Sequence, residues 1–205
     1  MTAIPAEDTW TTVETRQGTA RFHLDAEGGD GLLVLGHGAG GGTRSLDLLA
    51  ARAAAHDAGF RVALVEQPWR VRGRKVAEPP PKLDLAWVDV LRELSGTPLV
   101  VGGRSAGARV ACRTAAEVGA DAVLCLAFPL HPPGRPERSR LAELTAVTVP
   151  VLVVQGDRDA FGVPPKATLV PGADHGFRVA KGMPGAAAQV REHVQRWLGS
   201  LAIRT

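Results

Sequence analysis

Ser105 lies in the segment that points most directly to covalent chemistry. The segment reads Gly103-Arg-Ser-Ala-Gly107 and matches the pattern G-x-S-x-G. It falls between Leu99–Val101, whose apolar residues predict a strand, and Ser105–Val118, which predicts a helix. Between a strand and a helix, the two glycines allow the sharp turn that exposes a serine as a nucleophile. A serine at this position also suits a helix N-cap, so the chemical interpretation depends on the partners that the rest of the chain supplies.

A serine nucleophile needs a base that takes its proton and an acid that orients the base. The strand expected at 149–154 runs into a turn that holds Asp157 and Asp159. The strand expected at 167–170 runs into a loop that holds His175. Each candidate therefore follows a different strand, and the order serine, aspartate, histidine is one of the known chain orders of such triads.

The elements that must position these residues alternate between strand and helix along the chain. The alternation predicts an α/β fold with a mostly parallel central sheet and helices on both faces. Ligands of such sheets bind beyond the carboxyl ends of the strands. We expect a single domain over residues 1–205, with a short hairpin at about 12–24. The expected strands are 32–35, 61–65, 99–101, 122–127, 149–154 and 167–170, and the expected helices are 43–58, 83–94, 105–118, 138–144 and 185–201.

The glycine-rich loop Gly36–Gly42 allows two interpretations. Gly36, Gly38 and Gly41 match G-x-G-x-x-G, a pattern typical of dinucleotide-binding domains, and Glu66 after the next strand would then bind a ribose. Alternatively, the loop directs backbone N–H groups at an oxyanion, as in serine hydrolases. The loop alone does not decide between the two.

Four segments of the chain resemble the α/β-hydrolase fold. They are Gly-His-Gly-Ala-Gly-Gly at 36–41, Gly-Gly-Arg-Ser-Ala-Gly-Ala-Arg at 102–109, Gly-Asp-Arg-Asp-Ala-Phe-Gly at 156–162 and Gly-Ala-Asp-His-Gly-Phe at 172–177. Within that fold they are most similar to the compact dienelactone-hydrolase-like branch, which includes testis-expressed protein thirty and its bacterial relatives. The similarity spans about residues 30–200, which is nearly the whole chain.

The resemblance implies a role for each residue of the triad. By it, Ser105 is the nucleophile, His175 is the base and Asp159 is the acid. Asp157 is the alternative acid, and otherwise a turn residue that stabilises its loop. The sequence departs from the family at Ala106, where many members carry a bulky residue. The small side chain leaves more room beside the nucleophile and keeps the backbone N–H.

The resemblance also implies that the backbone N–H groups of Ala39 and Ala106 stabilise the oxyanion. For His37 in the glycine loop, we favour a hydrogen bond that orders the loop over a role in proton transfer. Four residues are candidates to line the pocket: His37, Arg104, His131 and Phe161. His23, His56 and His193 fall on expected edge or helix positions, and we predict that they are surface residues.

The composition is that of a soluble globular chain, because 45% of the 205 residues are apolar and 22% are charged. It excludes a disordered or collagen-like chain, and no apolar run approaches the roughly 20 residues of a membrane-spanning helix. The start shows no secretory signal, and Cys112 and Cys125 fall in expected core elements. We therefore expect free thiols in the cytoplasm.

The chain has a net charge of +3 and one dense basic run, Arg70–Lys75. We interpret this run as a solvated loop, or else as a rim that attracts an anionic substrate, rather than as a nucleic-acid site.

The sequence therefore predicts a serine hydrolase that acts on a small-molecule ester or thioester, without a nucleic-acid or membrane partner. No histidine and cysteine residues have metal-ligand spacing, and we expect neither a metal nor a cofactor. The connection 128–147 is too short for a large cap, which predicts an open, shallow pocket for a small or extended substrate. The alternatives are a catalytically idle interaction protein of the same fold and a dinucleotide-binding domain. The oligomeric state is not indicated.

Overall fold

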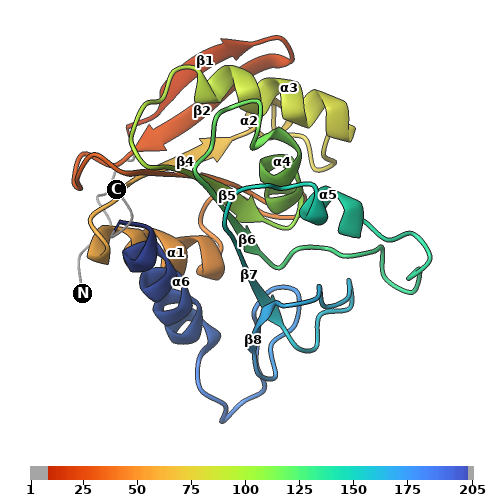
Figure 1. The fold of residues 1–205 in the computed structure, drawn as a ribbon. Coiled ribbons are helices and arrows are strands. Elements are labelled where there is room, and N and C mark those ends of the chain that lie inside the picture. Colours follow the sequence, from red (N-terminus) through yellow and green to blue (C-terminus); the bar gives the residue numbers. More distant parts are fainter. Residues whose placement is uncertain (1–8, 203–205) are drawn as a thin grey trace.

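The computed structural model describes residues 9–202, which build an eight-stranded sheet with helices on both faces (Figure 1). The strand order is β1-β2-β4-β3-β5-β6-β7-β8. The strands β1 and β2 form an antiparallel hairpin, β2 pairs antiparallel with β4, and every other pair is parallel. The strands are β1 Thr11–Thr15, β2 Gly18–Leu24, β3 Leu32–Gly36, β4 Arg61–Glu66, β5 Leu99–Arg104, β6 Ala122–Leu126, β7 Val151–Gly156 and β8 Thr168–Val170.

The helices confirm the expected α/β alternation. In Figure 1, α1 and α6 lie together on one face of the sheet, and α3, α4 and α5 lie on the other. Between β6 and β7 the described chain holds only the short α5, so no large cap covers the sheet there. No helix within residues 9–202 is both long enough and apolar enough to span a membrane. The helices are α1 Leu46–Asp57, α2 Pro68–Val71, α3 Pro80–Leu91, α4 Ala106–Thr114, α5 Leu141–Thr145 and α6 Ala186–Ala202.

Most predicted helices differ from the observed ones by a few residues at their ends, and two further differences have a clear physical reason. The segment after β4 was expected to be a loop, but it contains the short helix α2, which begins at Pro68. Proline suits the first turn of a helix because its fixed backbone angle is helical and its missing N–H is not needed there. The strand expected at 149–154 instead runs from Val151 to Gly156. Pro150 directly precedes it and has no N–H to donate to a ladder.

Side chains of the central strands alternate between two apolar clusters, one on each face of the sheet. In β3, Leu32 and Val34 pack into the cluster that includes α3 and α4, whereas Leu33 and Leu35 pack into the cluster that includes α1 and α6. All four are fully buried. This burial on both faces explains why the strand reads as a continuous apolar run rather than as an alternating one.

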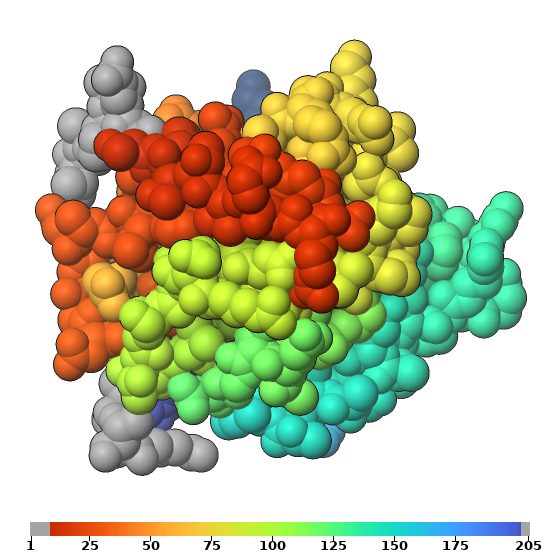
Figure 2. All heavy atoms as spheres, turned by 90° about the horizontal axis from the view of Figure 1, so that it is seen from above, coloured from red at the N-terminus to blue at the C-terminus, as the bar shows by residue number. Residues whose placement is uncertain are grey.

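The N-terminal hairpin is attached to α3 by an ion pair. Arg16 in the hairpin turn places Nη2 2.8 Å from Asp89 Oδ1, and its backbone N–H donates to Asp89 Oδ2 at 2.9 Å. Figure 2 shows the hairpin, in red, lying alongside the yellow-green surface that includes α3. The hairpin therefore helps to fix α3 on the sheet.

The prediction that His23 and His56 are ordinary surface residues is wrong. Both place Nε2 against the carboxylate of Asp25, at 3.0 and 2.8 Å, and the side chain of Asp25 is only 5% exposed. Arg52 donates to the same carboxylate through Nε at 2.7 Å. A buried carboxylate needs such partners because an unpaired charge is costly away from water. The cluster joins the end of β2 to α1.

We predict that Asp25→Ala lowers the free energy of unfolding by about 3 kcal/mol, because it leaves the Arg52 charge in a partly buried place without its partner. Asp57→Ala is the matched control, since Asp57 pairs with Arg191 at the surface, where the two side chains are 32% and 51% exposed. The control should cost less than about 1 kcal/mol. Urea unfolding measures both values, and equal losses would contradict the structural role of Asp25.

Candidate active site

Ser105 occupies a strained turn between β5 and α4. Its backbone angles are φ 53° and ψ −109°, in a region that residues other than glycine rarely adopt. A Cβ atom on either Gly103 or Gly107 would lie 2.4 Å from the carbonyl oxygen of Gly36 in β3. Only glycine therefore fits at the two flanking positions, and the close packing of β3 holds the serine at the tip of the turn.

Three loops at the carboxyl ends of parallel strands bring Ser105, His175 and Asp159 into one chain of contacts. Ser105 Oγ lies 3.0 Å from His175 Nε2, and His175 Nδ1 lies 2.7 Å from Asp159 Oδ2. Because a carboxylate accepts hydrogen bonds, the proton of the neutral imidazole belongs on Nδ1. Nε2 is then an acceptor for the serine hydroxyl proton.

The carboxylate of Asp159 is fully buried and hydrogen-bonded at both oxygens. Oδ1 accepts from the backbone N–H of Phe161 at 2.8 Å, and Oδ2 accepts from Gln155 Nε2 at 2.7 Å as well as from His175. The Phe161 ring also lies against the His175 ring, with centroids 4.2 Å apart. Sequence reasoning missed Gln155, whose side chain the structure shows to be fully buried at the end of β7.

Asp157 has a different role from Asp159 in the structure. Its Oδ1 accepts the backbone N–H of Gly172 at 2.7 Å, which joins the two loops after β7 and β8. Asp174, next to the histidine, likewise accepts the backbone N–H groups of Gly176 and Arg178, at 2.8 and 2.9 Å. Both side chains therefore stabilise the loop backbone around the triad geometry.

Arg104 ties the loop of His175 to helix α1. Its Nη2 donates to the backbone carbonyl of His175 at 2.9 Å, and its Nε lies 3.1 Å from Oδ2 of the buried Asp47. Burial raises the pKa of Asp47, and the Arg104 charge partly offsets that rise. The sequence predicts Arg104 as a pocket residue and gives no signal for Asp47. In the structure Arg104 instead braces the histidine loop.

The family model of the alpha/beta hydrolase domain matches residues 29–197. The chain belongs to the alpha/beta hydrolase family. A serine hydrolase without lid from Xanthomonas campestris is 21% identical, with a TM-score of 0.70 over 96% of this chain and 98% of that one. An esterase from Pyrobaculum calidifontis is 16% identical, with a TM-score of 0.68 over 95% of this chain and 85% of that one. A dienelactone hydrolase from Anabaena variabilis is 19% identical, with a TM-score of 0.69 over 93% of this chain and 96% of that one. No curated protein matches the chain.

Family membership and local geometry correct the dinucleotide interpretation of Gly36–Gly42 in this alpha/beta hydrolase. The helix that follows the loop begins only at Leu46, so the glycines do not lead directly into a helix N-terminus that could hold a pyrophosphate. Glu66, the residue expected to bind a ribose, is paired with Arg21 at 2.6 Å, and Arg70 Nε lies 3.8 Å from it.

Two more arginines of the basic run, Arg72 and Arg74, are also paired with acid. Arg72 and Arg74 both lie within hydrogen-bond distance of Glu78 Oε1, at 3.2 and 3.0 Å. These contacts favour the interpretation of Arg70–Lys75 as a solvated loop. Among residues 9–202, no group of three or more His, Cys, Asp or Glu side chains could hold a metal ion.

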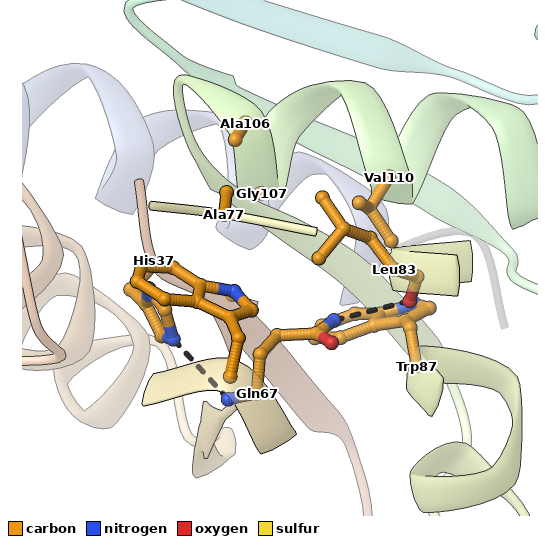
Figure 3. A pocket seen from close by; sticks show the side chains of 10 residues that line it. His37, Gln67, Ala77, Leu83, Trp87, Ala106, Gly107 and Val110 are labelled. Carbon is orange, nitrogen blue, oxygen red and sulfur yellow. Dashed lines mark hydrogen bonds between the residues drawn. The ribbon is translucent and has the colours of Figure 1, made fainter. Parts of the chain in front are cut away.

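A narrow hollow adjoins the first turn of α4 in this hydrolase (Figure 3). Of its lining residues only Ala77 and Ala106 are partly exposed, so it meets solvent at those two. It is therefore narrower and more enclosed than the open, shallow pocket that the sequence predicted. The hollow is lined by Gly36, His37, Gln67, Trp69, Ala77, Leu83, Trp87, Ala106, Gly107 and Val110.

Of the four residues predicted to line a pocket, His37 is the one that borders this hollow. Arg104 instead contacts the backbone carbonyl of His175 and the carboxylate of Asp47, and the ring of Phe161 lies against that of His175. His131 packs against the loop of the acid instead: its backbone N–H donates to Phe161 at 3.0 Å, and a Cβ on Gly162 would lie 2.5 Å from its Nε2.

The two residues predicted to stabilise an oxyanion lie at the start of α4 and in the loop after β3. Ala106 is the first residue of α4, and the first N–H groups of a helix have no acceptor within the helix. Ala39 is exposed in the loop after β3. Its neighbour Gly38 packs close to the turn of the serine, since a Cβ there would lie 3.4 Å from Ser105 Cβ.

His37 uses both ring nitrogens to order the glycine loop. Nδ1 lies 2.9 Å from the carbonyl of Gly38, and Nε2 accepts the backbone N–H of Gln67 at 3.2 Å. The ring is therefore a neutral tautomer with its proton on Nδ1. Burial lowers its pKa from the ordinary value of 6.5, because the charged form is poorly solvated there.

This lowered pKa makes stability depend on pH. Below about pH 6.5 the unfolded chain protonates His37 more readily than the folded chain does, so stability falls as the pH decreases. We predict that the urea midpoint of wild type falls more steeply between pH 7 and pH 5 than that of His37→Gln. His193→Gln, on the partly exposed side of α6, is the control and should keep the wild-type slope. An unchanged slope in His37→Gln would refute the assignment.

Proposed function

We propose that this alpha/beta hydrolase is a serine hydrolase that transfers the acyl group of a carboxylic ester or thioester to water. The observation that carries the proposal is the chain of contacts from Ser105 Oγ through His175 to Asp159, at 3.0 and 2.7 Å. The names of the similar structures, a serine hydrolase, an esterase and a dienelactone hydrolase, also favour ester cleavage.

The reaction begins when Ser105 Oγ attacks the carbonyl carbon and His175 Nε2 takes the hydroxyl proton. The imidazolium that forms carries its second proton on Nδ1, which donates to Asp159. Since Asp159 is held by Gln155 and by the backbone of Phe161, it keeps its orientation while the histidine changes charge. Arg104 holds the histidine from the other side through its backbone carbonyl.

The tetrahedral intermediate carries its negative charge on the former carbonyl oxygen. The backbone N–H groups of Ala39 and Ala106 are the donors that we assign to this oxygen. A single such donor is worth about 3–4 kcal/mol of transition-state stabilisation in other hydrolases. The rigid packing of Gly36 against Gly107 supports this role, because a donor is effective only when it is already in place.

The intermediate collapses when the bond to the leaving group breaks and His175 Nε2 returns its proton to the leaving oxygen or sulfur. A water molecule then attacks the acyl-serine, with the same nitrogen as its base. Release of the acid regenerates Ser105. The free thiols Cys112 and Cys125 take no part, since both are buried in the core.

We also propose that the whole chain forms one domain and acts in the cytoplasm. The sulfur atoms of Cys112 and Cys125 lie 3.4 Å apart in the interior and remain free thiols, which fits a reducing compartment.

A fluorophosphonate probe tests the nucleophile. We expect stoichiometric labelling of wild type and none of Ser105→Ala, because the probe reacts only with an activated serine. Ser139→Ala is the control, since Ser139 lies on an exposed turn, and it should label like wild type. Equal labelling of Ser105→Ala would refute Ser105 as the nucleophile, and no labelling of a folded wild type would favour the catalytically idle interaction protein.

Two aspartates provide a matched test of the acid. We predict that Asp159→Asn lowers kcat by about 10⁴-fold, because an amide donor at that position favours the wrong histidine tautomer. Asp157→Asn should reduce kcat less than about tenfold, since that side chain accepts only a backbone N–H of the neighbouring loop. Steady-state hydrolysis of a nitrophenyl ester measures both, and a reversed order would identify Asp157 as the acid.

A further inference from the structure

Two polar atoms in the wall of the hollow have no protein partner. Gln67 Oε1 and Trp87 Nε1 are buried, and no group within residues 9–202 forms a hydrogen bond with them. The two residues are only 6% and 1% exposed. A buried polar atom without a partner destabilises a fold, and such atoms often mark a place where a ligand binds. One is an acceptor and the other is a donor.

The free oxygen of Gln67 has a fixed position. Its Nε2 donates to the carbonyl of Leu83 at 3.2 Å, so the amide group cannot rotate by half a turn without losing that hydrogen bond. Its backbone N–H is held by His37. Leu83 and Trp87 are four residues apart in α3 and therefore lie on the same side of the helix. Figure 3 shows the Gln67 side chain extended towards this part of α3.

The size of the hollow limits what it can bind. Its enclosed part has about 10 Å³ that admits the centre of a water molecule. A single water needs about that much room. The rest of the wall is apolar, with Trp69, Leu83 and Val110 among its residues. The enclosed part therefore suits one small polar group, and the chain that carries the group must lie towards the exposed end at Ala106.

The place of the hollow relative to the triad assigns it to one end of the substrate. The leaving group must lie within reach of His175 Nε2, which returns the proton to it. None of His175, Asp159 and Phe161 lines the hollow, whereas Ala106, directly after the nucleophile, does. From this lining we assign the hollow to the acyl group rather than to the leaving group.

We propose that the hollow binds the acyl group of a short hydroxyacyl ester or thioester and recognises its hydroxyl. A hydroxyl both accepts and donates, so one oxygen can accept from Trp87 Nε1–H and donate to Gln67 Oε1. A methyl group of the same size leaves both protein atoms unpaired. This inference rests on the proposed esterase function and adds the class of acyl group.

Matched esters of one alcohol test the recognition: hydroxyacetyl against propionyl, and 3-hydroxypropionyl against butyryl. Each value of kcat/KM is divided by the rate of hydroxide-catalysed hydrolysis of the same ester, which removes intrinsic reactivity. We expect wild type to favour the hydroxylated ester at least tenfold in one of the pairs, as sites built to bind a hydroxyl do. Ratios near one, or in favour of methyl, in both pairs overturn the proposal.

Variants assign the preference to the two atoms. Trp87→Phe removes the N–H donor and keeps an aromatic ring, and Gln67→Met removes the acceptor from a side chain of similar length. Each variant should reduce the ratio of corrected kcat/KM values, hydroxylated over methyl ester, at least fivefold. Trp69→Phe is the matched control, because Trp69 lines the same hollow and its Nε1 is not one of the buried atoms without a partner. It should keep the wild-type ratio. A wild-type ratio in Trp87→Phe contradicts the proposal.

Binding to Ser105→Ala separates this inference from the proposed function. Saturation-transfer NMR compares the affinities of the same ester pairs for this variant, which keeps the hollow. Tighter binding of the hydroxylated ester supports the recognition even if wild type hydrolyses no ester, in which case only the proposed function fails. Equal affinities in both pairs overturn the recognition whatever the activity of wild type.

Discussion

The carbonyl oxygen of Gly36 comes so close to the start of α4 that neither Gly103 nor Gly107 has room for a side chain. This close contact between two backbone segments is the constraint on which the site depends. It forces β5 to end in a tight turn, and the turn holds Ser105 at a positive φ angle. The same contact sets the distance between the glycine loop and α4. The candidate nucleophile and the candidate oxyanion donors are therefore positioned by one packing interaction.

Around this turn polar contacts link distant parts of the chain. Asp159 has partners at both oxygens, and Arg104 connects the histidine loop to Asp47 in α1. Such networks rigidify a site, because each group fixes the orientation of the next. Among the buried polar atoms of residues 9–202 that have no hydrogen-bond partner, those of Gln67 and Trp87 are the ones in the wall of the hollow, and the proposed ligand is therefore placed there.

Local patterns predicted the order of elements and the loops that carry the candidate triad. The apolar runs of β3 and β6 and the glycines around Ser105 are signals that a few neighbouring residues contain. The partners of those residues carry no comparable signal. His23 and His56 look like surface residues, and only the packing of α1 against the end of β2 brings them to Asp25. Asp47 and Gln67 acquire their contacts in the same way, from residues far away in the chain. The short helix α2 was missed because four residues are too few to show a helical period.

The ion pair between the N-terminal hairpin and α3 has an evolutionary consequence. Arg16 holds Asp89, which lies in the same helix as Leu83 and Trp87 in the wall of the hollow. The hairpin contributes no residue to the loops of Ser105, Asp159 and His175. Mutations in it can therefore accumulate without altering the reacting groups, while each one that moves α3 reshapes the hollow. For the proposed esterase, the shape of the hollow is therefore coupled to the β1 edge of the sheet, away from the reacting groups.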